Sequence, residues 1–319
     1  MNQNVVYTPL KNGGKTLLID TDIGPDCDDA GALALAAALA ARYRVPVGAV
    51  VSCTSSRYGA PCAEAICRYC GLEVGVYAEN KQPGLLTREN NLRYNRLIAE
   101  RFGEKKEYGD AVSAYRQTLA GLPDGGAVVV AIGPFATLAQ LMQSPADRFS
   151  ELPGSALFAK KVSAVVSMSA KYPEGREYNI SCDPVSAILF FEHCGVPVFF
   201  ADFDAGYSVR SGFPAMDSPR EDPVYLSYLH YCSGGDYTQE QMNASYDLVA
   251  MHFAFEGESE TFALSEPARF TVCDDGRNEF FPDPSGNCRR ILKRVPDGTL
   301  GAYYSGILSS FGQARQGGN

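Results

Sequence analysis

Five aspartates lie close together within residues 16–41, a segment that contains no lysine or arginine. They are Asp20, Asp22, Asp26, Asp28 and Asp29. Asp20 and Asp22 are two positions apart at the end of an apolar run, so on a strand their side chains point to the same face. Crowded carboxylates repel one another unless a cation compensates their charge. Because no histidine or cysteine cluster accompanies them, these oxygen ligands suit a hard divalent cation, either calcium or magnesium.

Helix capping and phosphatase chemistry are alternative roles for these acids. Asp28 or Asp29 can cap a following helix and complement its dipole, which accounts for one acid but not for five. Asp20-Thr21-Asp22 also matches the start of magnesium-dependent aspartyl phosphatases of the haloacid-dehalogenase type, with Asp20 as the nucleophile. That alternative leaves the Asp28-Asp29 pair unexplained, and no convincing phosphate-binding lysine follows later in the chain.

Short apolar strands alternate with helices along the chain. We expect strands at 16–22, 46–52, 74–77, 127–132, 162–168 and 197–201. We expect helices at 29–42, 60–70, 89–102, 111–121, 135–143, 184–193, 246–256 and 300–311. This alternation predicts an α/β fold in which a mainly parallel, mixed central sheet is flanked by helices. Residues 1–319 form a single domain in this prediction, and ligands bind beyond the carboxyl ends of the strands.

Charge and composition exclude some classes of partner. The net charge of −9 argues against nucleic acid or an anionic membrane, since both require a basic face. The segment 1–15 has no apolar run typical of a signal peptide, and the charge-free stretch 30–41 is shorter than a bilayer span. The ten cysteines are scattered through apolar segments, as reduced, buried thiols are. We therefore expect a cytoplasmic protein that acts on a small molecule.

The aspartate segment resembles the first-strand motif of the inosine-uridine preferring nucleoside hydrolase family, Asp-x-Asp-Pro-Gly-x-Asp-Asp-Ala. Here the motif reads Asp20-Thr21-Asp22-Ile23-Gly24-Pro25-Asp26-Cys27-Asp28-Asp29-Ala30, with two additional residues before the final Asp pair. Further segments resemble the family in the same order: Ile132-Gly133-Pro134-Phe135-Ala136-Thr137, Glu177-Tyr178-Asn179 with Asp183-Pro184, Ser245-Tyr246-Asp247-Leu248, and Thr271-Val272 with Asp275-Gly276. The resemblance spans residues 16–280 and implies the Rossmann-like nucleoside hydrolase fold.

The resemblance also implies an activity and a set of roles. It implies calcium-dependent hydrolysis of the N-glycosidic bond of a ribonucleoside or related ribosyl compound, by a homodimer or homotetramer. The implied metal ligands are Asp22, Asp29, Asp247 and the backbone carbonyl of Ile132, and Asp22 is also the general base on the metal's water. The implied sugar contacts are Asp28, Glu177 and Asn179. This set suits glycoside cleavage, in which a carboxylate-rich pocket stabilises an oxocarbenium-like transition state.

Three departures from the family concern the sugar and the leaving group. Residues 52–56 contain no asparagine where the family places a sugar-binding one, and a second sugar-binding asparagine is missing from the shortened segment 170–176. Tyr246 stands where many members have a histidine that helps the base to leave. The leaving-group acid is then Tyr246, His230 or none, and we assign no role to Asp26. A non-catalytic, metal-dependent ribose- or nucleoside-binding protein is the main alternative.

Overall fold

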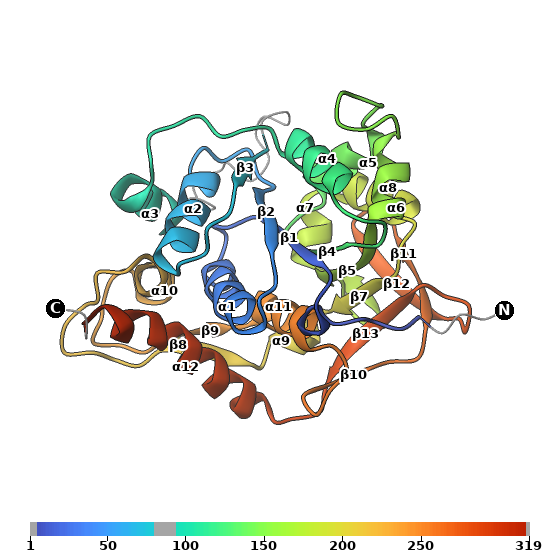
Figure 1. The fold of residues 1–319 in the computed structure, drawn as a ribbon. Helices are drawn as coiled ribbons and strands as arrows, with labels where there is room; N and C mark the ends of the chain where they lie inside the picture. Colours follow the sequence, from blue (N-terminus) through green and yellow to red (C-terminus); the bar gives the residue numbers. More distant parts are fainter. Residues whose placement is uncertain (1–4, 80–93, 317–319) are drawn as a thin grey trace.

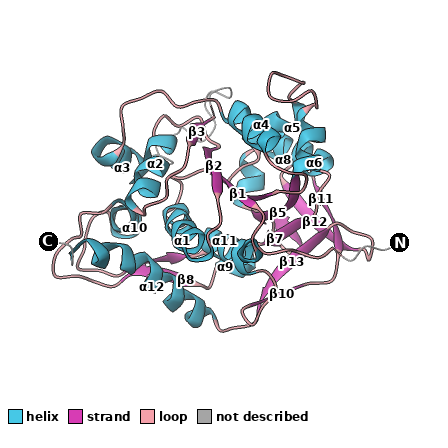
Figure 2. Cartoon of the chain, viewed as in Figure 1, coloured by secondary structure: helices cyan, strands magenta, loops and turns pink. Residues whose placement is uncertain are grey.

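The structure, a computed structural model, describes residues 5–79 and 94–316. Its centre is a mixed sheet of eleven strands in the order β3-β2-β1-β4-β5-β7-β13-β11-β12-β6, with β10 paired to β13 (Figure 1). The seven strands from β3 to β13 run parallel, and β11, β12, β6 and β10 pair antiparallel. The strands β8 and β9 form a separate two-stranded sheet, and Figure 2 shows β8 beside α12.

The strands are β1 (Thr16–Thr21), β2 (Val47–Ser52), β3 (Val76–Ala78), β4 (Ala127–Ile132), β5 (Val162–Met168), β6 (Glu174–Arg176), β7 (Val198–Ala201), β8 (Arg210–Phe213), β9 (Gln241–Ala244), β10 (Phe262–Leu264), β11 (Ala268–Val272), β12 (Arg277–Pro282) and β13 (Cys288–Lys293). The helices are α1 (Asp28–Tyr43), α2 (Gly59–Tyr69), α3 (Tyr94–Phe102), α4 (Ala111–Gly121), α5 (Ala136–Gln143), α6 (Gly154–Lys161), α7 (Tyr178–Cys182), α8 (Pro184–His193), α9 (Phe203–Gly206), α10 (Pro223–Ser233), α11 (Tyr246–Glu256) and α12 (Asp297–Gln316).

The central parallel strands are buried on both faces, as their continuous apolar runs require. Every residue of β1 and β4 is buried. Leu17 and Ile19 of β1 pack into a core that α1, α10, α11 and α12 share, whereas Leu18 packs into a second core with α4, α5, α6 and α8. The two groups of helices cover opposite faces of the sheet (Figure 1), because alternate residues of a strand point to opposite faces.

The elements expected from the sequence are largely confirmed. All six expected strands are present with ends within two residues of those expected. Of the expected helices, 111–121, 184–193 and 246–256 match to the residue, whereas the helix expected at 300–311 extends over Asp297–Gln316. The helix expected at 89–102 is present from Tyr94, and residues 89–93 lie outside the described part of the chain. None of the described helices is long and apolar enough to cross a bilayer.

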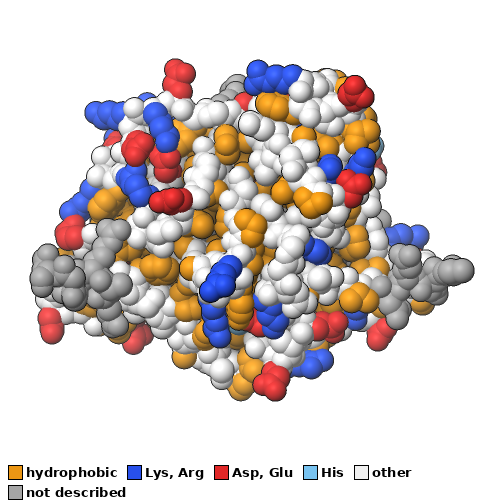
Figure 3. Space-filling model, viewed as in Figure 1, with side chains coloured by type: hydrophobic (Ala, Val, Ile, Leu, Met, Phe, Trp, Pro, Cys, Tyr) orange, Lys and Arg blue, Asp and Glu red, His pale blue; other side chains and the backbone are white. Residues whose placement is uncertain are grey.

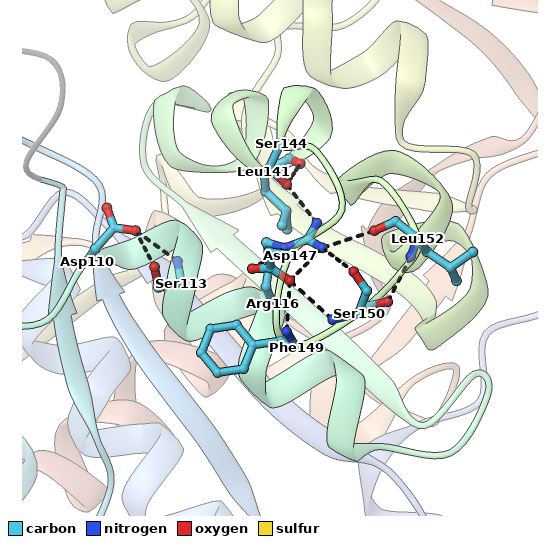
Figure 4. A network of polar contacts seen from close by, with 9 residues as sticks. All are labelled: Asp110, Ser113, Arg116, Leu141, Ser144, Asp147, Phe149, Ser150 and Leu152. Carbon is cyan, nitrogen blue, oxygen red and sulfur yellow. Dashed lines mark hydrogen bonds and ion pairs between the residues drawn. The ribbon is translucent and has the colours of Figure 1, made fainter.

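A buried arginine binds the loop that connects α5 and α6 through an ion pair and several hydrogen bonds. Arg116 of α4 is only 2% exposed, and its guanidinium pairs with Asp147 at 2.8 Å. It also donates to Ser144 Oγ at 3.0 Å and to the carbonyls of Ser150 and Leu152 at 3.1 and 3.0 Å (Figure 4). Arg116 holds the pKa of Asp147 down to about 2. This cluster balances its own charge.

On the molecular face drawn in Figure 3, basic and acidic side chains are interspersed.

Candidate functional site

A cavity of about 320 Å³ opens at the carboxyl ends of β1, β4 and β5, which are neighbours in the sheet. Asp22 follows β1, Ile132 ends β4 and Met168 ends β5, and all three line the cavity. The cavity lies where an open parallel sheet is expected to bind its ligand. Six carboxyl groups of the described residues line it: Asp22, Asp26, Asp28, Asp29, Glu177 and Asp247.

A close approach between β1 and β4 sets the floor of the cavity. Thr21 is paired in register with Ile132, so Asp22 and Gly133 leave the sheet side by side. A Cβ atom on Gly133 would lie 2.7 Å from Cys53 Sγ and 2.8 Å from Asp22 N, which no side chain allows. Glycine at this turn therefore lets the Ile132 end of β4 come up against Asp22.

The start of α1 joins two distant parts of the chain. Asp28 and Asp29 lie in its first turn, yet the N-cap residue makes no side-chain capping bond. Asp29 instead accepts a hydrogen bond from the Thr21 hydroxyl, and Asp28 Oδ2 accepts one from the backbone N–H of Asp247 at 2.9 Å. Helix capping therefore does not account for these two acids, because both carboxyl groups contact other partners at the cavity.

The start of α11 reaches the cavity through a second close approach. A Cβ atom on Gly206 of α9 would lie 2.3 Å from Tyr246 Cα, so only glycine lets α9 pack against this turn. Asp247 is 4% exposed, and Tyr246 lies beside Phe203 with ring centroids 5.4 Å apart. Asp247 thus reaches the aspartate segment from the far end of the chain.

Glu177 and Asn179 line the cavity from the segment around α7. The backbone N–H groups of Ala170, Asn179 and Ile180 donate to the Glu177 carboxylate at 3.2, 2.9 and 3.3 Å, so Glu177 is also the N-cap of α7. Burial raises the pKa of Glu177 to about 7, although these N–H groups lower it. Asn179 Nδ2 donates to the Met168 carbonyl at 3.0 Å, which leaves Oδ1 as the atom that can accept from a ligand.

The electrostatics of the acidic residues favour a bound cation. Burial raises the pKa values of Asp22, Asp28, Asp29 and Asp247 well above the usual range, and the charges of neighbouring acids raise them further. Carboxyl oxygens of Asp26, Asp28 and Asp247 lie within 4.8 Å of one another. One calcium ion with oxygen ligands at about 2.3–2.6 Å can bridge that spacing. Among the described residues, the atoms around this group that can coordinate a metal are carboxyl and carbonyl oxygens. The residues therefore fit a hard divalent cation.

Four aromatic residues, which we call the aromatic wall, line the cavity together with the acids. They are Tyr178, Phe203, Tyr231 and Tyr246. Lys171 Nζ lies 4.1 Å from the Phe203 ring centroid, and Tyr207 stacks on the same ring at 5.1 Å. Arg176 is the one basic residue among the described residues of the lining, and it pairs with Asp275 at 2.6 Å. Sequence reasoning missed Tyr178, Phe203 and Arg176, although Arg176 and Tyr178 flank Glu177 directly.

Two residues considered from the sequence lie elsewhere. His230 is not among the described residues that line the cavity, whereas the next residue of α10, Tyr231, is. Asp20 is fully buried behind the cavity, where it accepts hydrogen bonds from the hydroxyls of Tyr115 and Thr137, both at 2.5 Å. Burial raises its pKa to about 6. A phosphatase nucleophile must contact its substrate, so this position of Asp20 argues against the phosphatase alternative.

Comparison with known proteins places the chain in a family. The sequence profile of the inosine-uridine preferring nucleoside hydrolases matches residues 17–274. Among solved structures, a plant nucleoside hydrolase is similar over 93% of this chain and 100% of its own, with 18% identity and a TM-score of 0.66. The inosine-uridine preferring nucleoside hydrolase of Bacillus anthracis is similar over 94% and 99%, with 12% identity and a TM-score of 0.65.

The purine-preferring ribonucleoside hydrolase of Gardnerella vaginalis is similar over 94% of this chain and 100% of its own, with 16% identity and a TM-score of 0.63. A search of curated protein sequences finds no match to this chain. The structural neighbours share the fold, and the profile covers most of the chain. The protein therefore belongs to the inosine-uridine preferring nucleoside hydrolase family.

Proposed function

We propose that this protein hydrolyses the N-glycosidic bond of a ribonucleoside or a related ribosyl compound, with Ca²⁺ as its cofactor and Asp22 as its general base. The observation that carries the proposal is one cavity lined by six carboxyl groups, Asn179 and the four residues of the aromatic wall. This arrangement matches the two halves of a nucleoside, since polar oxygens suit the sugar and aromatic rings suit a planar base. Family membership supports the reaction class.

Asp22, Asp29, Asp247 and the Ile132 carbonyl would hold the cation, and all four residues line the cavity. When bound, a calcium ion would orient and acidify a water molecule and offer further coordination positions to sugar hydroxyls. Each of the three carboxyl groups is at most 5% exposed. Buried carboxylates without a counter-charge are costly, so the same residues that would bind the cation depend on it for their ionised form.

Asp22 takes the proton from the attacking water in this proposal. Asp22 directly follows β1, where its backbone lies against Gly133. Asp28 and Asn179 accept hydrogen bonds from the ribose hydroxyls. Glu177 accepts a hydrogen bond from the backbone N–H of Asn179 and faces the same sugar. The negative charge of these groups stabilises the positive charge that develops on the sugar ring as the bond to the base breaks.

The leaving base would lie against the aromatic wall. Tyr246 and Phe203 offer adjacent ring faces, and the Tyr246 hydroxyl is a candidate donor to the departing base. Burial, then the charges of Asp28 and Asp26, raise the pKa of Tyr246, which keeps the hydroxyl protonated. Tyr246 is the stronger candidate for this role than His230, because His230 does not line the described part of the cavity.

The proposal is tested by incubating the protein with a panel of purine and pyrimidine ribonucleosides, either with calcium or with a chelator. The quantity measured is the free ribose released. We expect release that depends on calcium and is absent for the matching 2′-deoxyribonucleosides. Ribose or nucleoside binding by calorimetry, without release from any compound of the panel, would instead establish a binding protein and overturn the proposed activity.

A further inference from the structure

The segment between Asp22 and Asp28 is two residues longer than the corresponding segment of the family motif. Asp26 lies within this longer segment. The segment is anchored at both of its ends. Ile23 and Cys27 are fully buried, and the Ile23 carbonyl accepts a hydrogen bond from Asn95 Nδ2 at 3.1 Å. The part between these anchors contains Pro25 and Asp26, which are partly exposed and line the cavity. The insertion thus brings an additional carboxyl group to the site.

The position of Asp26 is that of a ligand rather than of a helix cap. The N-cap of α1 is Cys27, and its side chain makes no capping hydrogen bond. The Asp26 carboxyl group instead lies close to two other acids, because one oxygen each from Asp26, Asp28 and Asp247 fall within 4.8 Å of one another. That limit is about twice a calcium–oxygen distance, so one ion can contact an oxygen of each residue.

The surroundings of Asp26 make a cation the fitting partner. Its two neighbours in this group are buried, Asp28 at 1% and Asp247 at 4% exposure. The Asp247 carboxyl group lines the cavity, and no donor among the described residues hydrogen-bonds to it. The one described basic side chain of the lining, Arg176, is already paired with Asp275. A buried carboxylate without a donor or counter-charge is unfavourable, and a bound cation would supply the missing positive charge.

We propose that Asp26 is a direct ligand of the bound cation, an additional charged oxygen ligand that the shorter family motif does not contain. The inference rests on the proposed function, since it concerns the cation of the same site. Asp247 is common to the group around Asp26 and to the ligands expected from the family. The longer segment would therefore add one negative charge to the shell of the ion.

Calcium titration by calorimetry tests the affinity. In Asp26→Asn, we expect calcium to bind at least about 10-fold more weakly than to the unaltered protein, because the charge of the ligands tunes calcium affinity. Asp124→Asn is the matched control: it removes one negative charge from an exposed site that precedes the amino end of β4, opposite the cavity. The control should bind calcium as the unaltered protein does. Equal affinities in all three proteins would overturn the inference while leaving the proposed function standing.

Europium luminescence separates direct coordination from a through-space effect of charge. Eu³⁺ replaces calcium in oxygen sites, and its decay rates in H₂O and D₂O report the number of coordinated water molecules. In Asp26→Ala, we expect at least one more coordinated water than in the unaltered protein, with none gained in Asp124→Asn. An unchanged water count in Asp26→Ala would show that Asp26 acts only at a distance. If neither Ca²⁺ nor Eu³⁺ binds the unaltered protein, both this inference and the calcium-dependent function fail.

Discussion

Two clusters of largely buried charged side chains are present in this protein, and they are built in opposite ways. The Arg116 cluster joins one guanidinium to one carboxylate, one hydroxyl and two carbonyls, so its charge is balanced within the chain (Figure 4). The acidic cluster gathers six carboxyl groups around a cavity whose one described basic residue is paired elsewhere. The first cluster is balanced in charge by its own residues, whereas the second carries an excess of carboxyl groups that suits a cation from solution.

This difference means that equivalent substitutions have opposite consequences in the two clusters. Removing a partner from a balanced, buried network leaves unsatisfied groups and costs stability. Removing one of several like charges relieves repulsion, and the loss falls on binding and catalysis instead. Stability and function are thus separable between the two clusters, and substitutions in each cluster can test that separation.

The largest effect is expected for Asp22→Asn. If Asp22 removes the proton from the attacking water, the substitution lowers kcat by at least ~100-fold, the usual scale of losing a general base. Asparagine keeps the shape of the side chain, so the unfolding midpoint should not fall. Steady-state kinetics and thermal unfolding of the same preparations measure both quantities. Full turnover in Asp22→Asn would remove Asp22 from the mechanism and with it the main functional role of the acidic cluster.

Calcium should stabilise the protein through the acidic cluster. A ligand that binds only the folded state at 100 times its Kd adds about 2.7 kcal/mol to the free energy of unfolding. In Asp29→Asn, we expect this gain to shrink strongly, while the calcium-free variant is at least as stable as the calcium-free unaltered protein. Denaturant unfolding with calcium and with a chelator measures both. A calcium-free variant that is clearly less stable would show that the acids are already balanced within the chain.

Arg116→Met should show the opposite pattern. The substitution fills most of the volume but removes the partner of Asp147 and of two carbonyls, so we expect a loss of about 2–3 kcal/mol in the free energy of unfolding. The fully buried position of Arg116 supports the upper part of that range, and the partial exposure of Asp147 limits it. Calcium affinity, measured by calorimetry, should not change. Equal stability of variant and unaltered protein would mean that the cluster contributes no net stability.

The parallel half of the sheet could be predicted from the sequence because burial on both faces produces apolar runs. β4 and β5 have the bounds expected. The parallel strand β13 and the four antiparallel strands could not, because they are short or only partly buried and carry charges: β13 contains Arg289 and Arg290, and β6 has three residues. The helices α7 and α9 have only five and four residues, so they are too short to show a periodic apolar pattern.

The same distinction applies to the site. The aspartates of β1 and α1 are adjacent in sequence, so their proximity was foreseeable, and the place of Asp247 followed from the family resemblance. Phe203 and Arg176 reach the cavity only through long-range packing, such as the approach of Gly206 to Tyr246. Asp26 could not be given a role because the position of its carboxyl group depends on how the inserted residues are anchored at Ile23 and Cys27.

The smallest predicted effect is a dependence of the free energy of unfolding on pH, and it concerns the Arg116 cluster. Arg116 lowers the pKa of Asp147 from the ordinary value of 3.8 to about 2. The folded state therefore favours ionised Asp147, and this stabilisation is present above about pH 4 and is lost as the pH falls towards 2. Because Asp147 is partly exposed, we expect Asp147→Asn to lower the free energy of unfolding by only about 1 kcal/mol at pH 7. Unfolding measured from pH 2 to pH 7 should show the variant and the unaltered protein converging near pH 2, and a difference that stays constant over this range would mean that the ionised pair is not what Asp147 contributes.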